Sequence, residues 1–104
     1  MFITNSETIA TKEIIENLGL VKGNTIRAKN IGHDIGAALK NLIGGEVKGY
    51  TKMITDAREE ALSRMEEQAK ELGADAVINV RFTTSQLMSG AAEILAYGTA
   101  VKLK

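Results

Sequence analysis

At 104 residues, the chain has the usual size of one domain, which argues against an enzyme whose active site lies between two domains. Hydrophobic residues make up 44% of it and charged residues 25%, a balance typical of a folded globular protein. Its 13 basic and 13 acidic residues give no net charge that would attract nucleic acid or an anionic membrane.

The side chains that carry most catalytic and metal chemistry are scarce. The chain has no cysteine, which excludes disulfides, thiolate metal sites and cysteine nucleophiles. His33 is the only histidine, so a two-histidine metal motif within one chain is also excluded. We therefore expect no cofactor and no catalytic residues. Without a signal-like or membrane-spanning segment, a single cytoplasmic domain over residues 1–104 is predicted.

Strand-like spacing of apolar residues begins the regular structure, over residues 13–28. Gly19 and Gly23 interrupt it, and glycine within a strand indicates a bulge or a bend. The segment is one long bent strand or two short strands that meet near Gly23 and Asn24. The turn chemistry favours the break.

Two helices are predicted next. A short one covers residues 31–43, with Asn30 as its N-cap, and ends at two glycines. A long one covers residues 50–72 and has the strongest amphipathic pattern in the chain. The side chains of its apolar stripe are small at Ala57, Ala61 and Ala69, which predicts that the helix closely approaches a neighbouring backbone.

The C-terminal part predicts two strands, over residues 76–84 and 93–103, separated by a loop at about 85–91. In the first strand, Val77, Asn79 and Arg81 are expected on one side. The second strand is largely apolar on both sides, whereas a small antiparallel sheet normally keeps one face polar. Either a second copy of the chain covers the surplus apolar surface, or the strand bends at Gly98 and packs both sides within one chain.

Subunit contacts are therefore predicted on these two strands. The residues expected at the interface are Asn79, Arg81, Leu95, Tyr97, Val101 and Leu103. Asn79 and Arg81 could also bind a carboxylate or phosphate, but we favour a junction where they meet an acidic residue of a neighbouring subunit.

Five blocks of the sequence, in order and at matching spacing, resemble the YbjQ family over essentially the whole chain. The blocks are Asn30-Ile31-Gly32-His33-Asp34-Ile35, Gly44-Gly45-Glu46 followed by Tyr50-Thr51, Ala57-Arg58-Glu59-Glu60-Ala61, Leu72-Gly73-Ala74-Asp75-Ala76-Val77, and Tyr97-Gly98-Thr99-Ala100-Val101.

This resemblance implies a small α+β domain in which a helix pair packs on a mostly antiparallel sheet. The architecture would be dodecin-like, with the subunits assembled in a ring, a pentamer. The family is uncharacterised and is described as heavy-metal-binding. The resemblance therefore implies no catalytic residue in this chain.

A ligand or metal site is the alternative. Asn30, His33 and Asp34 lie at the start of the short helix, where free backbone N–H groups can hold a small acidic ligand, although helix capping explains the same residues. Glu46 joins this group without a physical explanation of its own. A ring could also gather one His33 per subunit into a shared metal site, for which His33 is only a weak candidate.

Three hypotheses follow. The first is a homo-oligomer with a binding or scaffolding role, and the second is a protein that binds a metal or small ligand at pockets between subunits. The third, an enzyme that uses carboxylates, has no nucleophile and base pair to support it. Neither nucleic acid nor a membrane is an expected partner.

Overall fold

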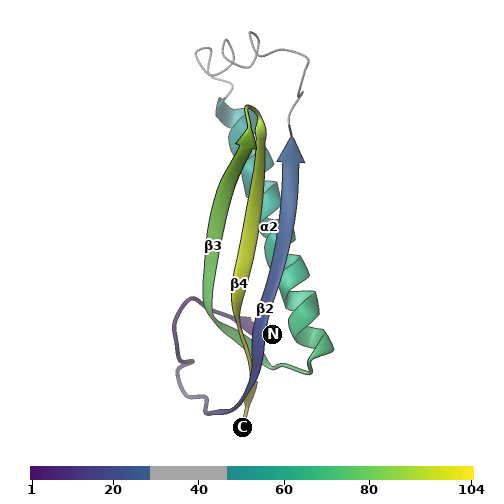
Figure 1. Ribbon diagram of the computed structural model, residues 1–104. Coiled ribbons are helices and arrows are strands. Elements are labelled where there is room, and N and C mark those ends of the chain that lie inside the picture. The colour runs from purple at the N-terminus through teal and green to yellow at the C-terminus, as the bar shows by residue number, and fades with distance from the viewer. Residues whose placement is uncertain (29–46) are drawn as a thin grey trace.

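The computed structural model describes residues 1–28 and 47–104. Its elements, in chain order, are β1 (Phe2–Ile3), β2 (Ile14–Ala28), α2 (Val47–Glu71), β3 (Ala76–Met88) and β4 (Ala91–Leu103). The strands form one sheet in the order β1-β3-β4-β2, in which β1 is parallel to β3 and the other neighbours are antiparallel (Figure 1). A small α+β domain with a mostly antiparallel sheet is thus confirmed. The short helix predicted at residues 31–43 lies outside the described residues.

Helix α2 has 25 residues and is about 37 Å long at 1.5 Å per residue. It lies along one face of the sheet, mainly over β2 and β4 (Figure 1). Its alanine stripe is fully buried, and a side chain at Gly23 of β2 would collide with the helix backbone at Ala61 and Met65. The predicted close approach is therefore confirmed, and Gly23 is the place where it happens.

Strand β2 is continuous for 15 residues, so the predicted break at Gly23 and Asn24 is wrong. Two irregularities in its pairing with β4, at Ile14/Glu16 and Asn17/Gly19, lie near its start, and Gly19 adopts a φ of +116°. The glycine that permits unusual backbone is Gly19, whereas Gly23 is required by the packed helix.

Strand β3 contains a bulge that changes which side its residues face. Asn79 has a φ of +54°, and the pairing with β4 shifts between Ile78 and Arg81. Val77 and Val80 therefore both pack under the helix, while Ile78 belongs to the cluster on the opposite face. The prediction that Val77, Asn79 and Arg81 share one side is wrong, because the bulge inserts a residue and reverses the alternation.

The predicted loop at residues 85–91 is also wrong. Strand β3 continues to Met88, and a tight turn that includes Gly90, with a φ of +79°, leads directly into β4. The result is a long hairpin whose tip lies away from both termini (Figure 1). Every residue of β3 from Arg81 to Met88 is exposed.

The molecule is elongated for its length. The radius of gyration is 17.1 Å and the principal extents are 55 × 22 × 16 Å, whereas a compact domain of this length has a radius of about 13 Å. An elongated two-layer molecule buries less apolar surface per residue than a compact one. No helix in the described part of the chain is long and apolar enough to cross a membrane.

Candidate subunit interface

The sheet face opposite α2 is divided into two halves. In the half near the termini, Ile78 and Val101 form a buried cluster with Ala76. Ile9 of the N-terminal segment packs on this cluster, as do Ile14 and Leu103. We call this the sealed half. Here β4 is covered on both sides by its own chain, which is the second of the two interpretations that the apolar pattern left open.

No residue of the described ranges, 1–28 and 47–104, covers the other half of this face, and we call it the open face. Its apolar members are Leu20, which is 67% exposed, Ile26, which is 60% exposed, Tyr97, which is 36% exposed, and the half-buried Leu95. Strand pairing places polar residues between them: Lys22, Asn24, Arg81, Thr83 and Glu93. An apolar patch rimmed by polar residues is typical of a protein–protein contact surface.

The charges of the open face follow from strand register. Tyr97 of β4 is paired with Lys22 on one side and with Arg81 on the other, so two cations flank its position. Glu93 lies nearer the hairpin end and accepts a hydrogen bond of 3.4 Å from the side-chain amide of Asn24. The face therefore carries two cations and one carboxylate.

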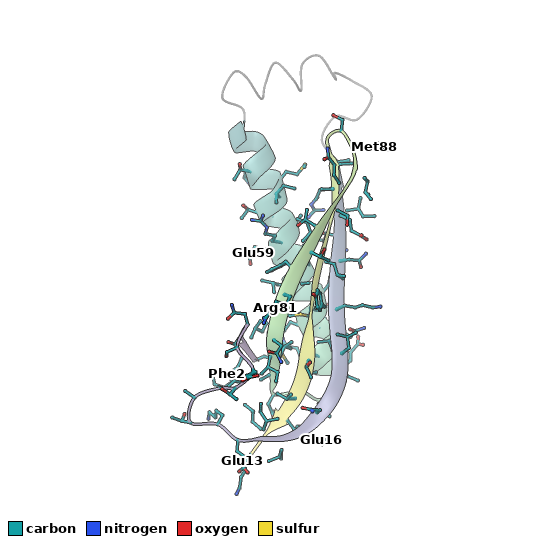
Figure 2. The ribbon with its side chains drawn as sticks, turned by 60° about the vertical axis from the view of Figure 1, so that its left-hand side comes forward. Phe2, Glu13, Glu16, Glu59, Arg81 and Met88 are labelled. Atoms are coloured by element: carbon teal, nitrogen blue, oxygen red, sulfur yellow. The ribbon has the colours of Figure 1, made fainter. Side chains whose placement is uncertain are left out.

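Arg81 marks the boundary between the two halves. Its guanidinium donates to the carbonyl oxygen of Asn5 at 2.7 Å and to that of Val80 at 3.0 Å. Figure 2 shows it near the middle of β3, between the hairpin tip at Met88 and the N-terminal segment at Phe2. The N-terminal segment, which covers the sealed half, does not extend over the sheet beyond this residue.

The structure divides the predicted contact residues. Arg81, Leu95 and Tyr97 lie together on the open face. Val101 is fully buried in the sealed half and Leu103 is half-buried beside it, so the contact surface proposed below does not include them.

Asn79 occupies the bulge and is half-buried, and its backbone N–H donates to the carbonyl oxygen of Ser6 at 2.9 Å. Leu20 and Ile26 also belong to the open face, although they were not predicted as contact residues. The available signal was their position in β2, since each alternates with Val21 or Thr25, which point toward the helix.

The predicted ligand residues Asn30, His33, Asp34 and Glu46 lie outside the described residues. Within the described part, no group of three or more histidine, cysteine, aspartate or glutamate side chains is placed to hold a metal ion. A shallow hollow of about 450 Å³ lies near the termini, and its lining is Met1, Phe2, Lys12, Asp75, Leu103 and Lys104. It is separate from the open face.

Comparison with known proteins identifies the family. A family model described as "Putative heavy-metal-binding" matches residues 1–104. The chain belongs to the YbjQ family. Proteins named UPF0145 from Archaeoglobus fulgidus and Halorubrum lacusprofundi are each 62% identical to it over 104 residues, which is 100% of this chain and 96% and 100% of theirs.

A crystal structure of a protein of unknown function from Pediococcus pentosaceus has the same fold. Its TM-score is 0.62 at 17% sequence identity, and the match covers 100% of this chain and 98% of that one. At this identity the likeness concerns the fold alone. The names of these YbjQ-family relatives state no activity, so the function has to be argued from the surface of this chain.

The described residues do not fit the metal in the family's description. Heavy metals prefer thiolate and imidazole ligands. The chain has no cysteine and a single histidine, His33. A heavy-metal site built from one chain of this YbjQ-family protein would therefore lack its preferred ligands.

Proposed function

We propose that this protein is a cytoplasmic homo-oligomer, a ring of five subunits, with a binding or scaffolding role in place of catalysis. The observation that carries the proposal is the open face, where Leu20, Ile26 and Tyr97 expose apolar surface on a part of the sheet that no described residue covers. A chain without net charge has no electrostatic barrier to association with identical copies.

A ring of five requires a heterologous contact, in which the open face of one subunit meets a different surface of the next. The outer surface of α2 fits this requirement by charge. The exposed and half-buried charged side chains that the structure describes on this surface, apart from the internal network of Glu60 and Arg64, include more acidic than basic residues. The acidic ones are Asp56, Glu59, Glu66, Glu67 and Glu71, and the basic ones are Lys52, Arg58 and Lys70. This surplus of carboxylates complements Lys22 and Arg81 on the open face.

The proposal is tested by measuring mass in solution. Light scattering behind a sizing column is expected to give a mass that is a whole multiple of five chains at micromolar concentration. Leu20→Lys, which places a charge in the centre of the contact, is expected to give a folded species of lower mass. Leu72→Lys is the matched control, because Leu72 is also an exposed leucine, 45% exposed, but lies beyond the helix and off the open face.

The outcomes discriminate clearly. A monomeric wild type would overturn the proposal, and so would a dimer, because neither contains a closed ring of five subunits. Equal effects of Leu20→Lys and Leu72→Lys would show that the open face is not the contact. Circular dichroism checks that both variants remain folded.

The alternative function is metal or small-ligand binding at pockets between subunits, which the family's description favours. In a ring, His33 of each subunit could contribute to a shared site, which would supply the imidazole ligands that one chain lacks. Asn30, Asp34 and Glu46 are the other candidates.

Its test is elemental analysis of untagged protein, followed by calorimetric titration with zinc, copper and nickel. Binding that requires assembly would be lost in both His33→Ala and Leu20→Lys and retained in Leu72→Lys. No bound metal and no heat with any of the three ions would exclude the metal function, while leaving the ring untouched.

A further inference from the structure

The two edges of the sheet differ in whether their outward backbone groups have hydrogen-bond partners. At the β2 edge, α2 supplies side chains to the outward backbone groups: the N–H of Lys22 donates to Oε1 of Gln68 at 2.7 Å, and Arg64 donates to the carbonyl oxygen of Asn24 at 2.5 Å. These groups are occupied, so this stretch of β2 is a poor template for another strand.

The other edge is covered only in part. The N-terminal segment runs beside β3, where the N–H of Thr4 donates to the carbonyl oxygen of Val77 at 3.0 Å and the N–H of Val80 donates to that of Thr4 at 3.0 Å. This cover ends at Arg81, whose guanidinium holds Asn5. From Phe82 to Met88, no backbone partner on the outer side is found among the described residues.

The uncovered edge lacks two of the features that keep edge strands apart, charge and proline, and its pairing with β4 is irregular only at the hairpin end, between Gln86 and Met88. Residues 82–92 contain no charged residue and no proline, whereas monomeric proteins place such residues on exposed edges to prevent pairing. The large apolar side chains here are solvent-accessible, with Phe82 43%, Leu87 51% and Met88 53% exposed. Because the N–H of Val80 points outward and strand backbones alternate, Phe82, Thr84 and Gln86 present their N–H and C=O groups outward.

We propose that this edge pairs with the same edge of a second copy, antiparallel and across a two-fold axis at Ser85. The facing pairs are then Phe82 with Met88, Thr83 with Leu87, Thr84 with Gln86, and Ser85 with its own equivalent. Apolar residues meet at both ends, small polar residues meet in the centre, and no like charges are opposed. The alternative partner, the β2 edge of another copy, is disfavoured because Gln68 and Arg64 already occupy it.

This contact goes beyond the proposed ring, since it uses a backbone edge and not the open face. In a ring it joins subunits of two rings in pairs, so the particle has an even number of chains. The two contacts fail separately: a charge at Leu20 disrupts the ring contact and leaves the β3 edge intact.

Because the chain has no cysteine, single cysteines can be introduced to test the strand pairing by disulfide cross-linking. In Ser85→Cys the two thiols face each other in a non-hydrogen-bonded pair, where the Cα separation of about 4.5 Å suits a disulfide. Mild oxidation is expected to give about ten-fold more covalent dimer than Ser63→Cys, an exposed serine on α2, because only the paired thiols have a high effective concentration.

The register of the proposed strand pairing is tested by mixing two different cysteine variants. Thr83→Cys and Leu87→Cys are expected to cross-link to each other when mixed, and much less when each is alone. Thr84→Pro, which removes an outward N–H and leaves the bonds to β4 in place, is expected to halve the mass of the particle. Circular dichroism verifies the fold of each variant.

Cross-linking of Ser85→Cys no greater than that of Ser63→Cys would overturn the proposal. If the mass then still corresponds to five chains, the ring stands and only the edge pairing is wrong. If Leu20→Lys loses the ring but cross-linking through Ser85→Cys persists, the edge pairing stands and is independent of the ring.

Discussion

The sealed half and the open face belong to the same side of the same sheet, yet their residues differ in burial. Val101 and Tyr97 both lie on β4 and share its alternation, but Val101 is fully buried and Tyr97 is 36% exposed. The difference comes from the N-terminal segment, which packs Ile9 over one half and ends its cover at Arg81. Burial here depends on which distant segment crosses a strand, and not on the strand's own pattern.

The strongest test of this comparison is a charge in each half. Val101→Asp is expected to lower the free energy of unfolding by more than about 4 kcal/mol, because the carboxylate would be buried without a partner. Tyr97→Asp should change the stability of the folded chain far less, while reducing its association. Urea denaturation monitored by circular dichroism measures both, and similar losses in the two variants would show that the halves do not differ.

Gly23 tests the other face of the sheet, which packs under the helix. Gly23→Ala is expected to cost about 1–3 kcal/mol, since its methyl group would displace the backbone of α2. Asn24→Ala, the exposed neighbour on the same strand, should cost less than about 0.5 kcal/mol. Thermal and urea unfolding provide the values, and a neutral Gly23→Ala would contradict the close packing of α2 on β2.

Substitutions of two isoleucines, one in the sealed half and one on the open face, test how much each side chain contributes to stability. Ile9→Ala is expected to lower the free energy of unfolding by about 1–2 kcal/mol, because the half-buried side chain seals the cluster around Val101. Ile26→Ala on the open face should stay within about 0.5 kcal/mol in a folded, unassembled chain. Binding of a hydrophobic dye should rise for Ile9→Ala alone; a rise of equal size in Ile26→Ala would mean that Ile9 seals nothing.

The smallest effect is expected at the protected edge. Gln68→Ala frees the N–H of Lys22 and should cost about 0.5–1 kcal/mol. Amide exchange at Lys22 should accelerate, while exchange at residues that bond β4 stays slow. Glu67→Ala is the exposed control on the same helix, and unchanged exchange at Lys22 in Gln68→Ala would refute the capping of this edge.

Much of the fold could be predicted because it follows from local periodicity. The long helix, its alanine stripe and the C-terminal strands follow from 3.6- and 2-residue patterns that neighbouring residues enforce. The failures occur where a single residue changes the register. The bulge at Asn79 reverses the alternation of β3, and the uncharged run after Arg81 has the composition of a loop but forms a strand because β4 pairs with it.

The candidate interface was predicted in part for the same reason. The two-sided apolar pattern of β4 pointed to Leu95 and Tyr97, which lie on the open face, but it gave equal weight to Val101, which the chain buries itself; the role of Leu95 and Tyr97 in subunit contact stays a prediction. Leu20 and Ile26 were missed because their neighbours across the sheet are unknown until β2 and β4 are aligned.

The sequence by itself determined the long helix, the presence of the strands, the absence of cysteine, the zero net charge and the family, since each depends on residues close in the chain or on composition. Only the tertiary structure decided which apolar residues remain exposed and which sheet edge is capped. Those outcomes depend on contacts between segments far apart in sequence, such as Ile9 with the cluster around Val101 and Gln68 with Lys22. Local patterns contain no information about such contacts, because the same alternation is compatible with either cover or solvent.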